Sequence, residues 1–146
     1  MDPRAILVPL DGSTMAESAL EMAERFAEGR GTKLILLRAA EAPEDLAHVV
    51  AARLDAMRAA ESYLDATAAD LDARGFDDVE TIARYGPATD VILDTARTRD
   101  HDLIVMATRG RSGVGRLMFG SVTEDVVRGA PTPVLVVRRQ TVSGAD

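Results

Sequence analysis

The sequence predicts an α/β protein in which helices cover both faces of one five-stranded, doubly wound parallel sheet. Five short apolar runs alternate with helical segments, at residues 5–10, 33–39, 79–85, 102–107 and 133–138. Four of these runs are almost continuous Ile, Leu and Val, which is typical of strands buried on both faces. Strands that alternate with helices form right-handed crossovers, so we expect the strands to be parallel. The 146 residues suit one domain, which we place at 1–139, followed by a loose tail at 140–146.

The run at 79–85, VETIARY, differs from the other four. It is more polar, and apolar residues alternate more with polar ones. This pattern indicates a strand that is less buried than its neighbours. We therefore predict that it lies at an edge of the sheet.

The first helix is predicted to begin at Ser13 or Thr14, because Thr14 and Glu17 have the spacing of a capping box. Gly29 and Gly31 are expected to end it. Its apolar stripe is predicted from residues that recur at helical spacing: Met15, Ala19, Met22, Ala23 and Phe26.

Three further helices are expected. The second is long and runs from Pro43 to a stop at Gly75. The third begins at Pro87, which suits the first helical position, and the fourth runs from Ser121 to about Arg128. The apolar face of the long helix is predicted from these residues: Leu46, Val50, Leu54, Met57, Leu64, Ala68 and Leu71.

Composition and charge exclude several classes of function. The net charge is −7 and the isoelectric point is about 4.8, which argues against sequence-independent binding to nucleic acid or an anionic membrane. No apolar run approaches the roughly 18 residues that span a bilayer, and the N-terminal sequence lacks the pattern of a signal peptide. The absence of cysteine excludes disulfides, thiol catalysis and cysteine-based zinc sites. We therefore expect a cytoplasmic protein that binds neither nucleic acid nor membrane.

Lysine usage restricts the chemistry of anion binding. Lys33 is the only lysine, and every other basic side chain except histidine is an arginine. A phosphate-binding Gly-Lys-Ser/Thr loop is therefore excluded. Anions must be bound by arginine or by backbone N–H groups.

Two strand ends carry unusual loops, PLDGS at 9–13 and ATRGRSGVGRLMFGS at 107–121. In an open doubly wound sheet, ligands bind beyond the carboxyl ends of the strands, where the strand order reverses. If these two strands are neighbours at that point, both loops face the same crevice.

The second loop has the composition of an anion-binding loop. Residues 107–120 contain three arginines and no acidic residue, so they carry +3 and the rest of the chain carries −7 − 3 = −10. Ser121 and Glu124 have capping-box spacing, and the free N–H groups of a helix start favour a phosphate. A glycine-rich loop without a ligand is the alternative interpretation. Four glycines permit close backbone approach and positive φ: Gly110, Gly113, Gly115 and Gly120.

This loop does not contain the dinucleotide fingerprint G-x-G-x-x-G. The closest segment is GVGRLM at 113–118, in which Met118 takes the place of the last glycine. It also follows the fourth strand, whereas that fingerprint normally follows the first. A dinucleotide is therefore not the expected ligand.

Four segments together carry a resemblance to a known family. They are VPLDGS after the first strand, GPATDVILDTA before the fourth, APTPVLVV at the end, and the loop positions Ala107, Gly110, Gly120 and Ser121. The chain resembles the universal stress proteins, whose ATP-binding members carry Gly, two residues, Gly, nine residues and then Gly-Ser or Gly-Thr. Ala107 departs from the first motif glycine, a small change if φ is negative there and a damaging one if φ is positive. The resemblance implies an adenine nucleotide alpha hydrolase-like fold with strand order 3-2-1-4-5.

The resemblance also implies a nucleotide site built from both loops. The ligand would be ATP, with AMP or ADP as alternatives, and Mg²⁺ would accompany the nucleotide. The adenine and ribose side would comprise Pro9, Leu10, Asp11 and Ala39. The ribose and phosphate side would comprise Gly110, Gly120, Ser121 and Val122. The remaining candidates lie on the same strand end and loop: Met106, Ala107, Arg109, Arg111 and Gly113.

Asp11 has two predicted roles. Its carboxylate would repel a bare triphosphate, so it should face ribose, adenine or a bound Mg²⁺, which makes it the candidate metal ligand. It also suits a helix cap or the turn at DGS. Both roles can coexist.

Three functions fit these observations. The first is a regulatory ATP-binding universal stress protein, the second a slow Mg²⁺-dependent ATPase or self-phosphorylating protein, and the third an interaction module that has lost nucleotide binding. We predict no catalytic residue, since His48 and His101 fit solvated positions. We expect a homodimer formed through residues 133–138, because a terminal apolar strand would otherwise leave an exposed edge. A protein partner is also expected, and the sequence does not identify it.

Overall fold

The five strands form one parallel sheet with the order β3-β2-β1-β4-β5 in a computed structural model that describes residues 2–42, 49–110 and 120–140. The strands are β1 (Ala5–Pro9), β2 (Lys33–Ala40), β3 (Val79–Tyr85), β4 (Leu103–Gly110) and β5 (Val134–Gln140). The helices are α1 (Thr14–Ala27), α2 (Val49–Ala73), α3 (Ala88–Thr98) and α4 (Ser121–Gly129). The predicted fold class and the edge position of residues 79–85 are confirmed.

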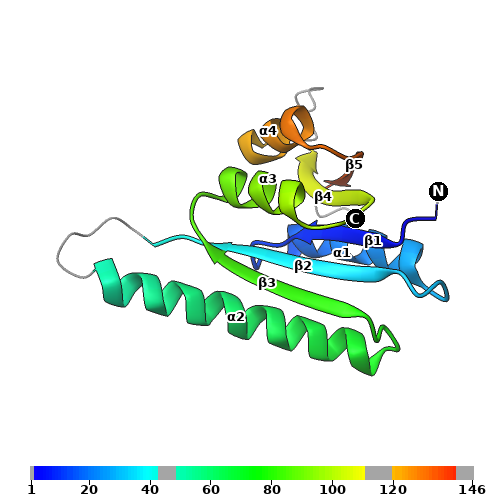
Figure 1. Cartoon of the computed structure of the whole chain (residues 1–146), viewed down its shortest axis with the longest axis horizontal. Coiled ribbons are helices and arrows are strands. Elements are labelled where there is room, and N and C mark those ends of the chain that lie inside the picture. The colour runs from blue at the N-terminus through cyan, green and yellow to red at the C-terminus, as the bar shows by residue number, and fades with distance from the viewer. Residues whose placement is uncertain (1, 43–48, 111–119, 141–146) are drawn as a thin grey trace.

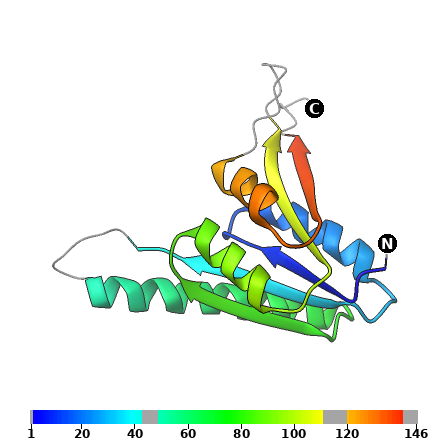
Figure 2. The same ribbon diagram turned by 45° about the horizontal axis from the view of Figure 1, so that its top comes forward.

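Alternate residues of β1 face two separate cores. Ile6 and Val8 pack in the core under α1 and α2, whereas Leu7 packs in the core under α3 and α4. Figures 1 and 2 show these two pairs of helices on opposite faces of the sheet. Each of these three side chains is fully buried, which explains the continuous apolar run in the sequence. The order reverses between β1 and β4, so the carboxyl ends of these two strands meet at the switch point.

The start of α1 is as predicted, but its cap is a different residue. Ser13 has the extended backbone of an N-cap, and its Oγ accepts a hydrogen bond from Ala16 N at 3.1 Å. Thr14 is already helical, so the predicted capping box with Glu17 is wrong. The buried face is also rotated from the predicted stripe, and Met15, Met22 and Phe26 are only half-buried. The buried residues are Ala16, Ala19, Leu20, Ala23 and Ala27.

The apolar face predicted for α2 is wrong over its first half. Val50 is 74% exposed and Leu54 52% exposed, because the N-terminal end of the helix extends beyond the ends of β2 and β3 (Figure 1). Only Ala60, Leu64 and Leu71 are buried along this helix. The predicted start at residue 43 and the predicted face residue 46 lie outside the described residues.

The fourth helix also begins differently from the prediction. Gly120 occupies the N-cap position, Ser121 is the first helical residue, and no side chain in the described part of the chain caps the helix. Glu124 instead pairs with Arg128 at 2.6 Å, so the predicted Ser121–Glu124 capping box is wrong. A similar one-residue shift puts Pro87 at the N-cap of α3 rather than at its first position.

The last strand includes the first residue of the predicted C-terminal tail. Gln140 belongs to β5, and the rest of the expected tail, 141–146, lies outside the described residues. Among the helices that the structure describes, none combines the length and the apolar character that crossing a bilayer requires.

Candidate functional site

A cavity of about 470 Å³ opens at the carboxyl edge of the sheet, where β1 and β4 end. Its walls come from the β1–α1 turn, β2, β4 and the starts of α3 and α4. The structure brings these predicted site residues together around it: Pro9, Leu10, Asp11, Ala39, Met106, Ala107, Gly120, Ser121 and Val122. The described parts of the two predicted loops therefore face one crevice.

The other four predicted site residues lie at the end of a strand or outside the described residues. Arg109 and Gly110 form the last two positions of β4, so the strand runs further than the sequence indicated. Arg111 and Gly113 lie outside the described residues, as do Gly115, Arg116 and Met118 of the same loop. The phosphate-side arginines therefore stay a prediction.

One end of the cavity is apolar. Ala39 and Met106 line it from β2 and β4, and Ala88 and Ile92 line it from α3. Ala88 and Ile92 are one helical turn apart, so they present one face to the cavity. Such a surface accepts a flat apolar ring better than a charged group.

The sequence reasoning missed part of this lining. The additional residues are Met15, Ala16, Leu37, Ala88, Ile92, Thr108 and Thr123. Leu37 could have been predicted from the sequence, because it lies two residues before Ala39 and alternate strand residues share a face. The α3 residues carried no such signal, since their approach to the cavity depends on how that helix crosses the sheet.

The β1–α1 turn forms a polar wall with a fixed geometry. Asp11 Oδ1 accepts hydrogen bonds from Ser13 N at 2.9 Å and from Ser13 Oγ at 2.5 Å. Gly12 has φ +85°, in the left-handed region that favours glycine. The turn-shaping role predicted for Asp11 is thus confirmed, and its exposed carboxylate lines the cavity at the same time.

The start of α4 forms a second polar wall. Gly120 N donates to the Oγ1 of Thr108, a residue only 2% exposed, at 3.4 Å, which ties the helix start to β4. The next N–H groups, of Ser121 to Thr123, belong to the first turn of the helix and have no acceptor within it. The positive end of the helix dipole lies at the same place. This arrangement suits an anion such as a phosphate.

Gly120 itself leaves room for a ligand. A Cβ built on it would meet nothing within 4 Å in the described part of the chain. Its φ is −61°, so the positive φ expected at this glycine is wrong. Helix capping, and not a left-handed turn, sets its backbone. Among the described residues, no neighbour packs on this position.

The described residues contain no group of three or more His, Cys, Asp or Glu side chains that could hold a metal ion. Asp11 is therefore not part of a preformed protein metal site in this region. His101 lies elsewhere: its Nε2 is 2.6 Å from Thr132 Oγ1 and its Nδ1 is 2.8 Å from the Arg99 carbonyl oxygen. His48 lies outside the described residues.

Comparison with known proteins agrees with this architecture. The sequence model of the universal stress protein family matches residues 3–138. The chain belongs to this family. It is 33% identical over 135 residues to a universal stress protein of Thermus aquaticus, covering 92% of this chain and 98% of that relative.

Solved structures of universal stress proteins share the fold. UspA from Lactobacillus plantarum matches with a TM-score of 0.75 and 30% identity, over 92% of this chain and 97% of that one. A universal stress protein in complex with cAMP matches with a TM-score of 0.72 and 26% identity, over 94% of this chain and 98% of that one.

The departure at Ala107 causes no backbone strain in this universal stress protein. Ala107 lies within β4 and pairs with Val137 of β5. No described residue other than glycine has a positive φ, so the extra methyl group is compatible with the strand. The backbone argument against nucleotide binding at this position is thereby removed.

Proposed function

We propose that this universal stress protein binds an adenine nucleotide, ATP with Mg²⁺, in the cavity between β1 and β4, and that the bound nucleotide sets the state of a regulatory dimer. One observation carries the proposal. One cavity has an apolar wall on β2, β4 and α3, and another of its walls is the start of α4, which no described side chain caps. A nucleotide has the same division, with a flat base at one end and phosphates at the other.

The proposal gives each part of the nucleotide a position in the cavity. Ala39 and Met106 would contact the base, and Asp11 would accept hydrogen bonds from the ribose. The phosphates would lie against the N–H groups of Ser121 and Val122, next to the open position at Gly120. The volume of about 470 Å³ falls within the usual range of small-molecule sites. A relative of known structure, 26% identical, was crystallised with cAMP, which supports the ligand class.

The residues present fit Mg²⁺ only as a companion of the nucleotide. Mg²⁺ is usually held by one or two carboxylates together with substrate phosphates and water. Asp11 is the acidic residue that lines the cavity in the described part of the chain. It would therefore contribute one ligand, and the phosphates would supply the rest of the charge.

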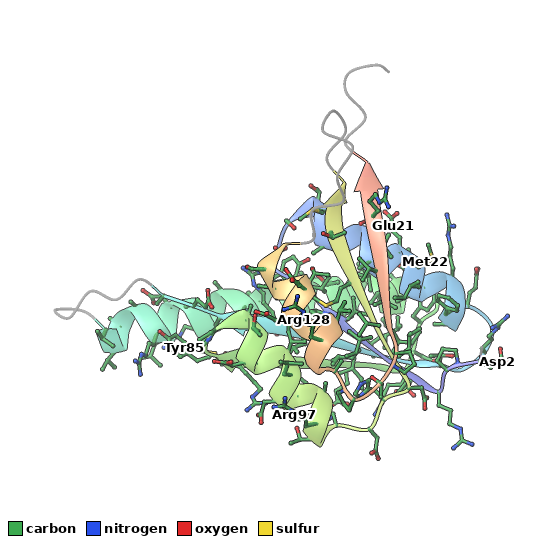
Figure 3. The ribbon with its side chains drawn as sticks, turned by 90° about the horizontal axis from the view of Figure 1, so that it is seen from above. Asp2, Glu21, Met22, Tyr85, Arg97 and Arg128 are labelled. Atoms are coloured by element: carbon green, nitrogen blue, oxygen red, sulfur yellow. The ribbon has the colours of Figure 1, made fainter. Side chains whose placement is uncertain are left out.

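The dimer is proposed through β5. This strand lies at an edge of the sheet, and its four consecutive apolar residues, 134–137, are all partly exposed. Figure 3 shows Glu21 and Met22 of α1 beside this strand, and both line a hollow with Val137 and Arg138. An apolar edge strand of this kind favours pairing with a second copy. Light scattering at micromolar concentration should give twice the chain mass, and a mass near 15.6 kDa would contradict the dimer.

The test of nucleotide binding is thermal unfolding of protein first freed of carried-over nucleotide. ATP with Mg²⁺ should raise the midpoint, and NADH should do so much less. A ligand present at about 100 times its dissociation constant adds about 2.7 kcal/mol to the free energy of unfolding. For a domain of this size that corresponds to a shift of several degrees. If millimolar ATP with Mg²⁺ produces no shift, an interaction module without nucleotide becomes the better interpretation.

Two arginine variants examine the phosphate end. Arg111→Ala and Arg116→Ala should reduce the ATP shift more than the AMP shift, if these side chains meet the outer phosphates. Arg97→Ala, on α3 and outside the cavity lining, is the matched control and should leave both shifts unchanged. Equal reductions with ATP and AMP would place the arginines away from the outer phosphates.

A further inference from the structure

Arg38 packs directly on the turn that carries Asp11. A Cβ built on Gly12 would lie 3.1 Å from Nη1, 3.2 Å from Nη2 and 3.3 Å from Cζ of Arg38. The two Nη atoms are the nearest, so the end of the guanidinium that carries them lies against Gly12. Glycine is favoured here for two reasons: its φ is +85°, and a Cβ would force the Arg38 guanidinium to move by a few tenths of an ångström.

Arg38 is in turn fixed by α2. Its Cζ lies 4.8 Å from the ring centroid of Tyr63, a cation–π contact. The hydroxyl of Tyr63 donates a hydrogen bond of 3.0 Å to Glu17 Oε2. Glu17 belongs to the first turn of α1, directly after the turn at Gly12. The contacts therefore run from the turn through β2 and α2 and return to the start of α1.

Arg38 supports the cavity without lining it. Its neighbour Ala39 lines the cavity, whereas Arg38 does not, because successive strand residues point to opposite faces of the sheet. The turn that Arg38 contacts supplies Asp11 to the cavity wall. A change at Arg38 can therefore reach the ligand only through the turn or through long-range charge.

We propose that Arg38 is a positioning residue: its guanidinium holds the Asp11–Ser13 turn in the conformation that receives the nucleotide and couples that turn to α2 through Tyr63. This proposal rests on the proposed function for its effect on affinity. The coupling is reciprocal, so a bound nucleotide also stabilises the packing of α2 on β2.

Calorimetric titration with ATP and Mg²⁺ measures the effect on affinity. Arg38→Ala should bind about tenfold more weakly, a loss in the range seen when a residue acts on a site without contacting the ligand. Arg53→Ala is the matched control, because Arg53 stacks on Tyr85 at the same 4.8 Å, at the exposed end of β3 beside α2 (Figure 3). It should bind as the parent does. Equal affinities for Arg38→Ala and the parent would overturn the proposal.

Two further variants separate positioning from other effects. Arg38→Lys keeps the charge but loses the planar face, so it should bind as weakly as Arg38→Ala. Full affinity in Arg38→Lys would show that charge attraction is the cause and would overturn the proposal. Because Arg38 acts through the turn, Arg38→Ala should add little to the loss caused by Asp11→Asn. Additive losses would likewise contradict it.

Amide exchange measured without nucleotide tests the same residue independently of the proposed function. The N–H groups of Ser13 and Ala16 are both hydrogen-bonded within the turn and the cap. They should exchange faster in Arg38→Ala than in the parent or in Arg53→Ala, while the amides of β4 keep their rates. Unchanged exchange at Ser13 and Ala16 would overturn the proposal. If the parent binds no nucleotide but these amides respond, the proposed function fails and the positioning role stands.

Discussion

The β1–α1 turn and the start of α4 both line the cavity, and both contain the dipeptide Gly-Ser. In the first, Gly12 lies in the turn and Ser13 caps α1 through its hydroxyl. In the second, Gly120 is itself the N-cap and Ser121 is already helical, with no capping bond from a described side chain. The same two residue types thus occupy different positions relative to the helix that follows.

The difference extends to the packing around each glycine. Gly12 has φ +85°, and a Cβ built on it would lie 3.1 Å from Nη1 of Arg38. Gly120 has φ −61°, and its built Cβ meets no atom within 4 Å in the described part of the chain. We infer that the first Gly-Ser pair is required by the fold, whereas the second would serve the proposed nucleotide.

The largest expected effect is on the ligand side. Gly120→Val should remove the stabilisation by ATP, about 2.7 kcal/mol at 100 times the dissociation constant, because the new side chain fills the space that a phosphate would approach. The free energy of unfolding without nucleotide should fall by only about 1 kcal/mol or less, since valine is a poor N-cap but fits this backbone. Thermal unfolding with and without ATP measures both quantities. A folded variant that binds ATP as tightly as the parent would show that the phosphates lie elsewhere.

The second effect is on the fold. Gly12→Ala should lower the free energy of unfolding by about 2 kcal/mol, because alanine is strained at a positive φ and its methyl group would displace the Arg38 guanidinium. Urea unfolding without nucleotide measures this loss. Gly120→Ala is the matched control and should cost much less. Equal losses of unfolding free energy in Gly12→Ala and Gly120→Ala would contradict the distinction between the two Gly-Ser pairs.

These outcomes depend on features that the sequence only partly predicted. The strands and their order followed from continuous apolar runs and from the family resemblance, and the two loops of the site followed from their position after β1 and β4. The helix caps did not, because both Thr14 and Ser121 have capping-box spacing while the residue before each has the N-cap backbone. Spacing in the sequence does not determine which of two adjacent residues leaves the helix.

Contacts between residues far apart in the sequence could not be predicted from local patterns. Val50 and Leu54 continue the helical apolar spacing of α2, yet they are exposed because that end of the helix extends past the sheet. The contact of Arg38 with Tyr63 joins residues 25 positions apart on different elements, and neither belongs to a motif. Such contacts depend on how a helix crosses the sheet, which local patterns do not encode.

The third prediction compares the two serines. Ser13→Ala should lower the free energy of unfolding by about 1 kcal/mol, because Ala16 N loses its capping acceptor and Asp11 loses a donor. Ser121→Ala should change the free energy of unfolding little, since its exposed hydroxyl caps no helix in the described part of the chain. It should instead weaken ATP binding, as Ser121 lines the cavity. Urea unfolding and calorimetric titration of both variants give the comparison, and a larger stability loss for Ser121→Ala would reverse it.

The smallest effect concerns pH and belongs to the β1–α1 side. Burial, and then the hydrogen bond to Glu17, raise the pKa of Tyr63 to about 12 from its ordinary value of 10.0. The folded protein therefore holds the phenolic proton more tightly than the unfolded chain does. The stabilisation from this group is fully present below pH 10 and is lost as pH rises from 10 to 12.

Urea midpoints across this range should fall less steeply in Tyr63→Phe than in the parent, because phenylalanine has no proton to lose. Near-ultraviolet absorbance of Tyr85→Phe reports Tyr63 alone, since the chain has two tyrosines. An ordinary tyrosine titration in that variant would mean that the Tyr63–Glu17 bond does not hold α2 to the start of α1 in solution. The turn at Gly12 would then lack the support that distinguishes it from the start of α4.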